Sequence, residues 1–143
     1  MHIKIKRLDP DLPLPGYAHP GDAGLDLYSS ECVTIHPGER KLISTGIAMA
    51  IPVGYAGFVQ PRSGLALKKG LGIVNTPGLI DSHYRGEIKV IAVNTDRINP
   101  IEIIKGDKIA QLVIQKVTYA ELIDVDELDD TERGGKGFGS SDQ

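Results

Sequence analysis

Five short segments of the chain combine charged or polar side chains with glycine, in patterns that can carry chemistry. One of them, GLIDSHYRGE at 78–87, places the carboxylate of Asp81 directly after Leu79 and Ile80, and the ring of Tyr84 three residues later. A carboxylate is ionised at neutral pH and can orient or deprotonate a water molecule. Asp81 is therefore a candidate catalytic group, although a turn aspartate that caps its own backbone is an equally good interpretation of this segment alone.

The segment PRSGLA at 61–66 combines groups that suit phosphate oxygens. Arg62 carries a fork of donors, Ser63 a hydroxyl, and the backbone amides around Gly64 lie where a short helix is expected to begin. The alternative is a helix N-cap formed by Ser63 beside a solvated Arg62. These six residues do not decide between the two interpretations.

Two further segments place a polar side chain inside an apolar run. In GDKIAQL at 106–112 the neutral amide is Gln111, and in AGLDLYS at 23–29 the carboxylate is Asp26, between two leucines. A polar residue on a strand surface is the more common explanation, and a ligand contact is the other.

The C-terminal segment RGGKGFGSS at 133–141 contains four glycines around one aromatic residue, Phe138. A flexible linker is the usual interpretation of such a composition. However, Phe138 has no core to join, and glycine lets a backbone lie close against phosphates. We therefore expect a flap that closes over a ligand.

Short apolar runs predict the elements that position these segments. Glycine, proline, aspartate or asparagine separate the runs, as expected for strands joined by tight turns. A short helix is expected at 63–69, ended by Gly70, and a hairpin is expected at 78–93. The number of strands predicts an all-β sandwich, barrel or jelly roll. The expected strands are 3–6, 32–35, 42–51, 57–60, 71–75, 88–94, 101–104 and 110–118.

Composition argues against several classes of protein. The chain of 143 residues is the size of one domain, and its formal net charge of -3 gives no basic surface for a nucleic acid. Cys32 is the only cysteine, and the four histidines lack the spacing of metal ligands, so neither an intrachain disulfide nor a zinc site is expected. No signal peptide and no run of ~20 apolar residues occurs, so we expect a soluble, cytoplasmic protein without a membrane partner.

Taken in order, the five segments resemble the five motifs of the homotrimeric dUTPase family. The resemblance extends from residue 23 to residue 141. It implies a jelly-roll β-barrel with one short helix, assembled as a homotrimer with sites shared between subunits. It also implies hydrolysis of dUTP to dUMP and pyrophosphate, with Mg²⁺ bound mainly through the triphosphate. This activity keeps uracil out of DNA and supplies dUMP for dTMP synthesis.

The resemblance also implies a role for each matching residue. Asp81 would activate the water that attacks the α-phosphate, and Tyr84 would pack on the deoxyribose and exclude a ribose 2′-hydroxyl. Asn75 and the backbone of Gly78, Leu79 and Ile80 would bind uracil. The implied phosphate and flap residues are Arg62, Ser63 and Gly64 from a neighbouring subunit, Lys89, Gln111, Arg133 at the γ-phosphate, Phe138 over the uracil, Gly139 and Ser140. No direct protein ligand to the metal is expected, and Asp26 would act on it through water.

The expected organisation is a β domain at 1–123 followed by a flexible arm at 124–143 that closes over an active site. Two alternatives stand beside the hydrolase. A dCTP deaminase would share the fold and some of the motifs, but it needs a glutamate placed for deamination and lacks so complete a phosphate-closing tail. A nucleotide-sensing trimer with a protein partner would bind dUTP with hydrolysis incidental.

Overall fold

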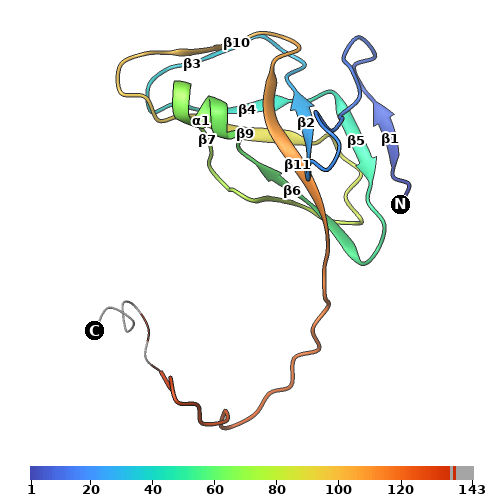
Figure 1. Cartoon of the computed structure of the whole chain (residues 1–143), viewed down its shortest axis with the longest axis vertical. Helices are drawn as coiled ribbons and strands as arrows, with labels where there is room; N and C mark the ends of the chain where they lie inside the picture. The colour runs from blue at the N-terminus through green and yellow to red at the C-terminus, as the bar shows by residue number, and fades with distance from the viewer. Residues whose placement is uncertain (136, 138–143) are drawn as a thin grey trace.

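The protein is mostly β, with one short helix (Figure 1). The computed structural model describes residues 1–135 and residue 137. Its strands are β1 (Lys4–Arg7), β2 (Gly24–Tyr28), β3 (Val33–Ile35), β4 (Arg40–Ser44), β5 (Ile47–Ala50), β6 (Tyr55–Gln60), β7 (Leu71–Ile73), β8 (Gly78–Ile80), β9 (Lys89–Asn94), β10 (Ile101–Ile103) and β11 (Lys108–Lys116). The helix, α1, spans Ser63–Lys69.

The strands pair into small antiparallel sheets. The largest sheet has the order β2-β11-β6-β8, and a second has the order β4-β9-β7. The two remaining sheets pair β1 with β5 and β3 with β10. Within the described part of the chain, none of these sheets closes into a barrel.

The largest sheet brings polar residues from distant segments into one row. Gln111 of β11 lies opposite Asp26 of β2 on one side and opposite Gln60 of β6 on the other. Val59, next to Gln60, lies opposite Gly78 of β8. Because paired strands are ~4.8 Å apart, this sheet places three of the predicted motifs close to one another.

An aliphatic core holds the sheets together. Leu27, Ile43, Ile88 and Leu112 are fully buried within it. Burial alternates along β9, where Val90, Ala92 and Asn94 point inward, as expected for a half-buried strand. The Asn94 amide donates hydrogen bonds to the carbonyls of Ile35 and Asn99, each at 2.9 Å, which ties β9 to β3 and to the loop that follows β9.

The predicted helix is confirmed at 63–69, and Gly70 ends it in the left-handed conformation with φ 69°. The prediction of one strand at 42–51 is wrong, because β4 and β5 are separate strands. Gly46 breaks the run with φ 71°, and a Cβ at this position would lie 2.8 Å from Cβ of Asp9. β2 is a strand that the apolar runs did not predict.

The predicted hairpin at 78–93 is also wrong, although both of its strands exist. β8 pairs with β6, whereas β9 pairs with β4 and β7. The segment 81–88 therefore connects two different sheets and is a loop. Long-range pairing decides which strand lies beside which, and the local pattern contains no information about it.

After β11 the chain leaves the body of strands (Figure 1). The described residues from 117 onward contain neither helix nor strand. They expose large apolar side chains, such as Leu122, which is 91% exposed, and Leu128, which is 88% exposed. No described helix has the length and apolar character needed to cross a membrane.

Candidate functional site

Asp81 directly follows β8 and lies at a cavity of about 330 Å³, which we call the Asp81 pocket. The side chains of Asp81 and Tyr84 are exposed. The pocket is lined by Leu42, Asn75, Leu79, Ile80, Asp81, Tyr84, Glu87, Lys89 and Ile91. Six predicted site residues therefore meet here, namely Asn75, Leu79, Ile80, Asp81, Tyr84 and Lys89.

The ring of Tyr84 is held in place by its own loop. Its hydroxyl donates a hydrogen bond of 2.9 Å to the carbonyl of Glu87. The ring also lies directly against Gly86, where an added Cβ would be 2.6 Å from Cζ of Tyr84. A separation this short does not occur in folded proteins, so Gly86 allows the ring to adopt this position.

Two charged residues shape the loop from 81 to 88. Arg85 donates hydrogen bonds to the carbonyls of Ser82 and Tyr84, at 2.7 and 2.9 Å. The carboxylate of Glu87 accepts the backbone N–H of Gly46 at 2.9 Å, and its other oxygen lies 3.5 Å from Nζ of Lys89. These bonds attach the loop to the turn between β4 and β5.

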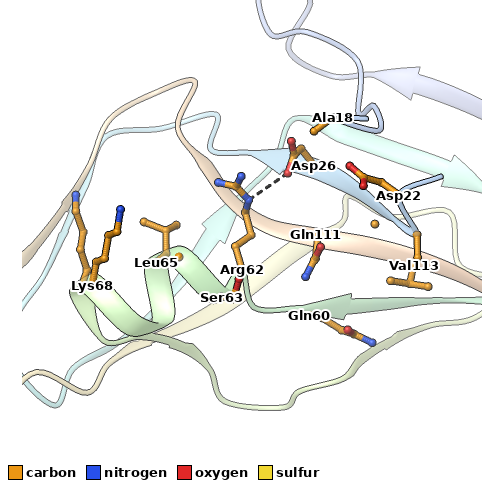
Figure 2. A pocket seen from close by; sticks show the side chains of 14 residues that line it. Ala18, Asp22, Asp26, Gln60, Arg62, Ser63, Leu65, Lys68, Gln111 and Val113 are labelled. Carbon is orange, nitrogen blue, oxygen red and sulfur yellow. Dashed lines mark ion pairs between the residues drawn. The ribbon is translucent and has the colours of Figure 1, made fainter. Parts of the chain in front are cut away.

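A second cavity, of about 570 Å³, lies where α1 begins, and we call it the Arg62 pocket. Its lining includes Asp26 of β2, Gln111 of β11, and Arg62, Ser63 and Gly64 at the start of α1. Figure 2 shows the Arg62 side chain pointing from α1 toward Asp26. All five of these residues were predicted to be site residues, and they come from three distant segments of the chain.

The Asp26 carboxylate is 6% exposed and forms two ion pairs. Nε of Arg62 lies 3.1 Å from Oδ1, and Nζ of Lys108 lies 2.7 Å from Oδ2. The hydrogen bond and the charge of Asp26 raise the pKa of the Lys108 ammonium. Two cations thus face the one carboxylate of Asp26. The charged side chains that line the pocket are Arg62, Lys68 and Lys69 against Asp22 and Asp26, so cations exceed carboxylates by one.

Gln111 is also fixed in position. Its amide donates a hydrogen bond of 2.9 Å to the carbonyl of Pro61, the residue that precedes Arg62. Gly24 of β2 leaves room for the amide, because an added Cβ there would lie 3.1 Å from Cδ of Gln111. The Gln111 side chain is therefore held at the wall of the Arg62 pocket.

The start of α1 differs from the capping alternative considered for PRSGLA. Arg62 occupies the N-cap position, and no side chain caps this helix end. Ser63 is the first helical residue, and its side chain does not cap the helix. Arg62 is half-buried in its ion pair with Asp26 rather than solvated.

The two pockets share no lining residue. The backbone of Gly78 is buried in β8 beside the Asp81 pocket. Arg133 lies among the described residues after β11 and contributes to neither pocket. Phe138, Gly139 and Ser140 lie outside the residues that the structure describes.

Three residues that hold parts of these pockets in place were not predicted as site residues. Lys108 pairs with Asp26, Glu87 anchors the loop at Lys89, and Arg85 binds that loop's carbonyls. Lys108 had a detectable signal, because it lies within GDKIAQL and a carboxylate in the apolar run GLDLY requires a cation when it is buried. Its pairing with β2 is a long-range contact that the sequence does not specify.

The described residues contain no group of three or more histidine, cysteine, aspartate or glutamate side chains that could hold a metal ion. The most buried carboxylate at either pocket, Asp26, already uses both oxygens in ion pairs.

The fold and the two pockets define a mostly β protein with one carboxylate-bearing cavity and one cationic cavity. The dUTPase family matches residues 11–142, and the chain belongs to this family. A deoxyuridine 5′-triphosphate nucleotidohydrolase of Thermobifida fusca is 58% identical over 141 residues, covering 99% of this chain and 79% of that protein.

Solved structures of phage dUTPases have the same fold. The Staphylococcus bacteriophage 80alpha dUTPase with dUpNHpp is 34% identical, has a TM-score of 0.88, and is matched over 98% of both chains. A variant dUTPase of phage phi11 of S. aureus, described with a structural Mg(II) ion, is 30% identical with a TM-score of 0.82, covering 89% of this chain and 98% of that one.

Proposed function

We propose that this enzyme hydrolyses dUTP to dUMP and pyrophosphate. The observation that carries the proposal is the meeting of Asp81, Tyr84 and Asn75 in one pocket beside the strand β8. A carboxylate, an aromatic ring and an amide are the groups needed to activate water, to bind a sugar and to bind a base. Membership of the dUTPase family supports the same activity.

Uracil binds in this proposal at the outer edge of β8. This strand is the last in its sheet, so the backbone N–H and C=O groups on the edge away from β6 are available to a ligand. Gly78, Leu79 and Ile80 offer these groups, and the Asn75 amide adds a side-chain contact. Cytosine reverses part of the donor and acceptor pattern, and each buried polar group left unpaired costs about 1–3 kcal/mol.

Tyr84 is proposed to select deoxyribose. Its ring is fixed by the hydrogen bond to Glu87 and by contact with Gly86. A fixed ring packed on the sugar leaves no space for a 2′-hydroxyl. Asp81, next to it at the pocket, orients or deprotonates the water that attacks the α-phosphorus, and the leaving group is pyrophosphate.

The Arg62 pocket is proposed to bind the phosphates of a nucleotide held by another subunit. Arg62, Ser63 and Gly64 supply donors, and Gln111 contacts the α-phosphate or the attacking water. The two pockets share no lining residue on one chain, which supports completion of the site by a second copy. Lys89 assists at the Asp81 pocket. The assembly in this proposal is a homotrimer of jelly-roll subunits.

The residues after 123 are proposed to form an arm that covers an active site. Exposed apolar side chains at Val125 and Leu128 support contact with another surface. Arg133 would pair with the γ-phosphate, and the arm would exclude water other than the nucleophile. Phe138 would cover the uracil ring, with Gly139 and Ser140 in close contact.

Mg²⁺ in this proposal binds mainly through the triphosphate. The metal supplies positive charge that offsets the charge of the phosphate oxygens. The oxygens of Asp26 hold Arg62 and Lys108, so Asp26 would act on the metal only through a water molecule.

The test is an assay of the purified chain with Mg²⁺ and either dUTP or dCTP. We expect equal amounts of dUMP and pyrophosphate from dUTP, and no ammonia from dCTP. Release of ammonia from dCTP would instead identify a deaminase. Tight binding of dUTP without turnover would favour a nucleotide-sensing protein.

A further inference from the structure

Lys108 and Arg62 bind different oxygens of the Asp26 carboxylate. A carboxylate commonly binds arginine in a bidentate arrangement, in which each carboxylate oxygen accepts a hydrogen bond from a guanidinium nitrogen. Here Lys108 occupies Oδ2 at 2.7 Å, so Arg62 reaches Oδ1 alone, through Nε at 3.1 Å. Asp26 thus binds Arg62 through one oxygen and Lys108 through the other.

The backbone of Lys108 binds the same guanidinium. Nη1 of Arg62 donates a hydrogen bond of 3.3 Å to the Lys108 carbonyl. Lys108 lies opposite Tyr28 of β2, and the register shifts between Lys108 and Ala110. Its ammonium lies over the Tyr28 ring, 5.9 Å from the ring centre.

These contacts hold two nitrogens of Arg62. Nε binds Asp26 and Nη1 binds the Lys108 carbonyl. The guanidinium therefore has a fixed orientation at the wall of the Arg62 pocket. Lys108 itself lines a different cavity, of about 380 Å³, which Arg62 also lines, and does not line the Arg62 pocket.

We propose that Lys108 is a positioning residue that holds the Arg62 guanidinium in the orientation that binds a substrate phosphate. It acts through Arg62 and Asp26 and does not contact the substrate. Because it orients a binding group, its loss weakens substrate binding more than it slows the chemical step. This inference rests on the proposed function, since the phosphate belongs to dUTP.

The experiment compares steady-state hydrolysis of dUTP by wild type, Lys108→Met, Lys108→Arg, Arg62→Met and the double variant. We expect Lys108→Met to raise KM about tenfold, the effect of a weakened charge-assisted hydrogen bond, with kcat changed less than about threefold. Lys108→Arg keeps the charge and restores most of the KM. In the Arg62→Met background, Lys108→Met changes KM by less than about twofold, because the guanidinium that Lys108 positions is absent.

Lys105→Met is the matched control. Lys105 forms an ion pair of the same length, 2.7 Å, with Asp9, and lines neither the Asp81 pocket nor the Arg62 pocket. Equal KM values for Lys108→Met and Lys105→Met would overturn the inference, as would an undiminished effect of Lys108→Met in the Arg62→Met background. If Lys108→Met does not fold, Lys108→Gln takes its place with the same outcomes. Absence of turnover by wild type would overturn the proposed function and this inference with it, whereas wild-type turnover with equal KM values would overturn this inference alone.

Discussion

Apart from Leu42, the residues that line the Asp81 pocket come from one stretch of chain, 75–91, whereas the Arg62 pocket draws on 18–26, 60–69 and 111–113. The first pocket is shaped by a loop that binds its own carbonyls and by a ring that lies on a glycine. The second is held by ion pairs between strands and a helix start. One depends on local geometry, and the other depends on long-range charge.

The two pockets should therefore respond differently to substitutions. A substitution in the Asp81 pocket alters the shape that holds the reacting atoms, so it should act on kcat or on substrate discrimination. A substitution in the Arg62 pocket alters the orientation of a charge, so it should act mainly on KM. The following variants separate these expectations.

Asp81→Asn should have the largest effect. Removing a general base reduces turnover by roughly a hundredfold to ten-thousandfold, while dUTP binding is retained because the amide keeps the shape of the carboxylate. The measurement is kcat together with the dissociation constant for dUTP. Asp11→Asn is the control, since that side chain is 83% exposed and lines neither pocket. Near-normal turnover by Asp81→Asn would remove Asp81 from the mechanism.

A chain ending at Asp130 should lose activity by about a hundredfold, the scale associated with lost transition-state donors. It should remain folded and keep the oligomeric state of the full chain, because none of the described residues after 130 is buried. Circular dichroism, light scattering and dUTP turnover check this. A chain ending at Ser141 is the control. Loss of the oligomer on truncation would make the arm structural and contradict a covering role.

The local character of the Asp81 pocket explains why much of it could be predicted. Asp81 and Tyr84 are close in sequence, and their common pocket follows from the loop that joins them. The short helix could be predicted equally well, because Gly70 marks its end within the same segment. The hairpin prediction was wrong because pairing of β8 with β6 is decided by the sheet as a whole.

The Arg62 pocket could be predicted only in part. The sequence indicated that Arg62, Gln111 and Asp26 are unusual in their surroundings, but it gave Asp26 two interpretations. The structure places Asp26 between Arg62 and Lys108, and these three residues are far apart in the chain. A buried carboxylate predicts that a cation must be nearby, and only the folded sheet shows which one.

Gly86→Ala tests whether shape controls the Asp81 pocket. The new Cβ would lie 2.6 Å from Cζ of Tyr84, so the ring must move away from its position. Forcing extra volume into a packed contact costs about 1–3 kcal/mol, and we expect kcat/KM for dUTP to fall about tenfold, with weaker discrimination against UTP. Gly16→Ala is the control, since its Cβ would meet only the Leu14 carbonyl, at 3.9 Å. If discrimination between dUTP and UTP does not change, Tyr84 does not select the sugar.

The smallest expected effect concerns the charge that holds the Arg62 pocket at high pH. Asp26 raises the pKa of Lys108, so Lys108 binds its proton more tightly in the folded chain than in the unfolded chain. Its contribution to stability is therefore fully present below its ordinary pKa of 10.5 and is lost as the pH rises through the higher pKa of the folded state. The Tm of wild type should exceed that of Lys108→Met at pH 8, and the difference should shrink above pH ~10.5. A difference in Tm that stays constant across this range would show that Lys108 stabilises the pocket by packing, and the contrast between a pocket held by shape and a pocket held by charge would not stand.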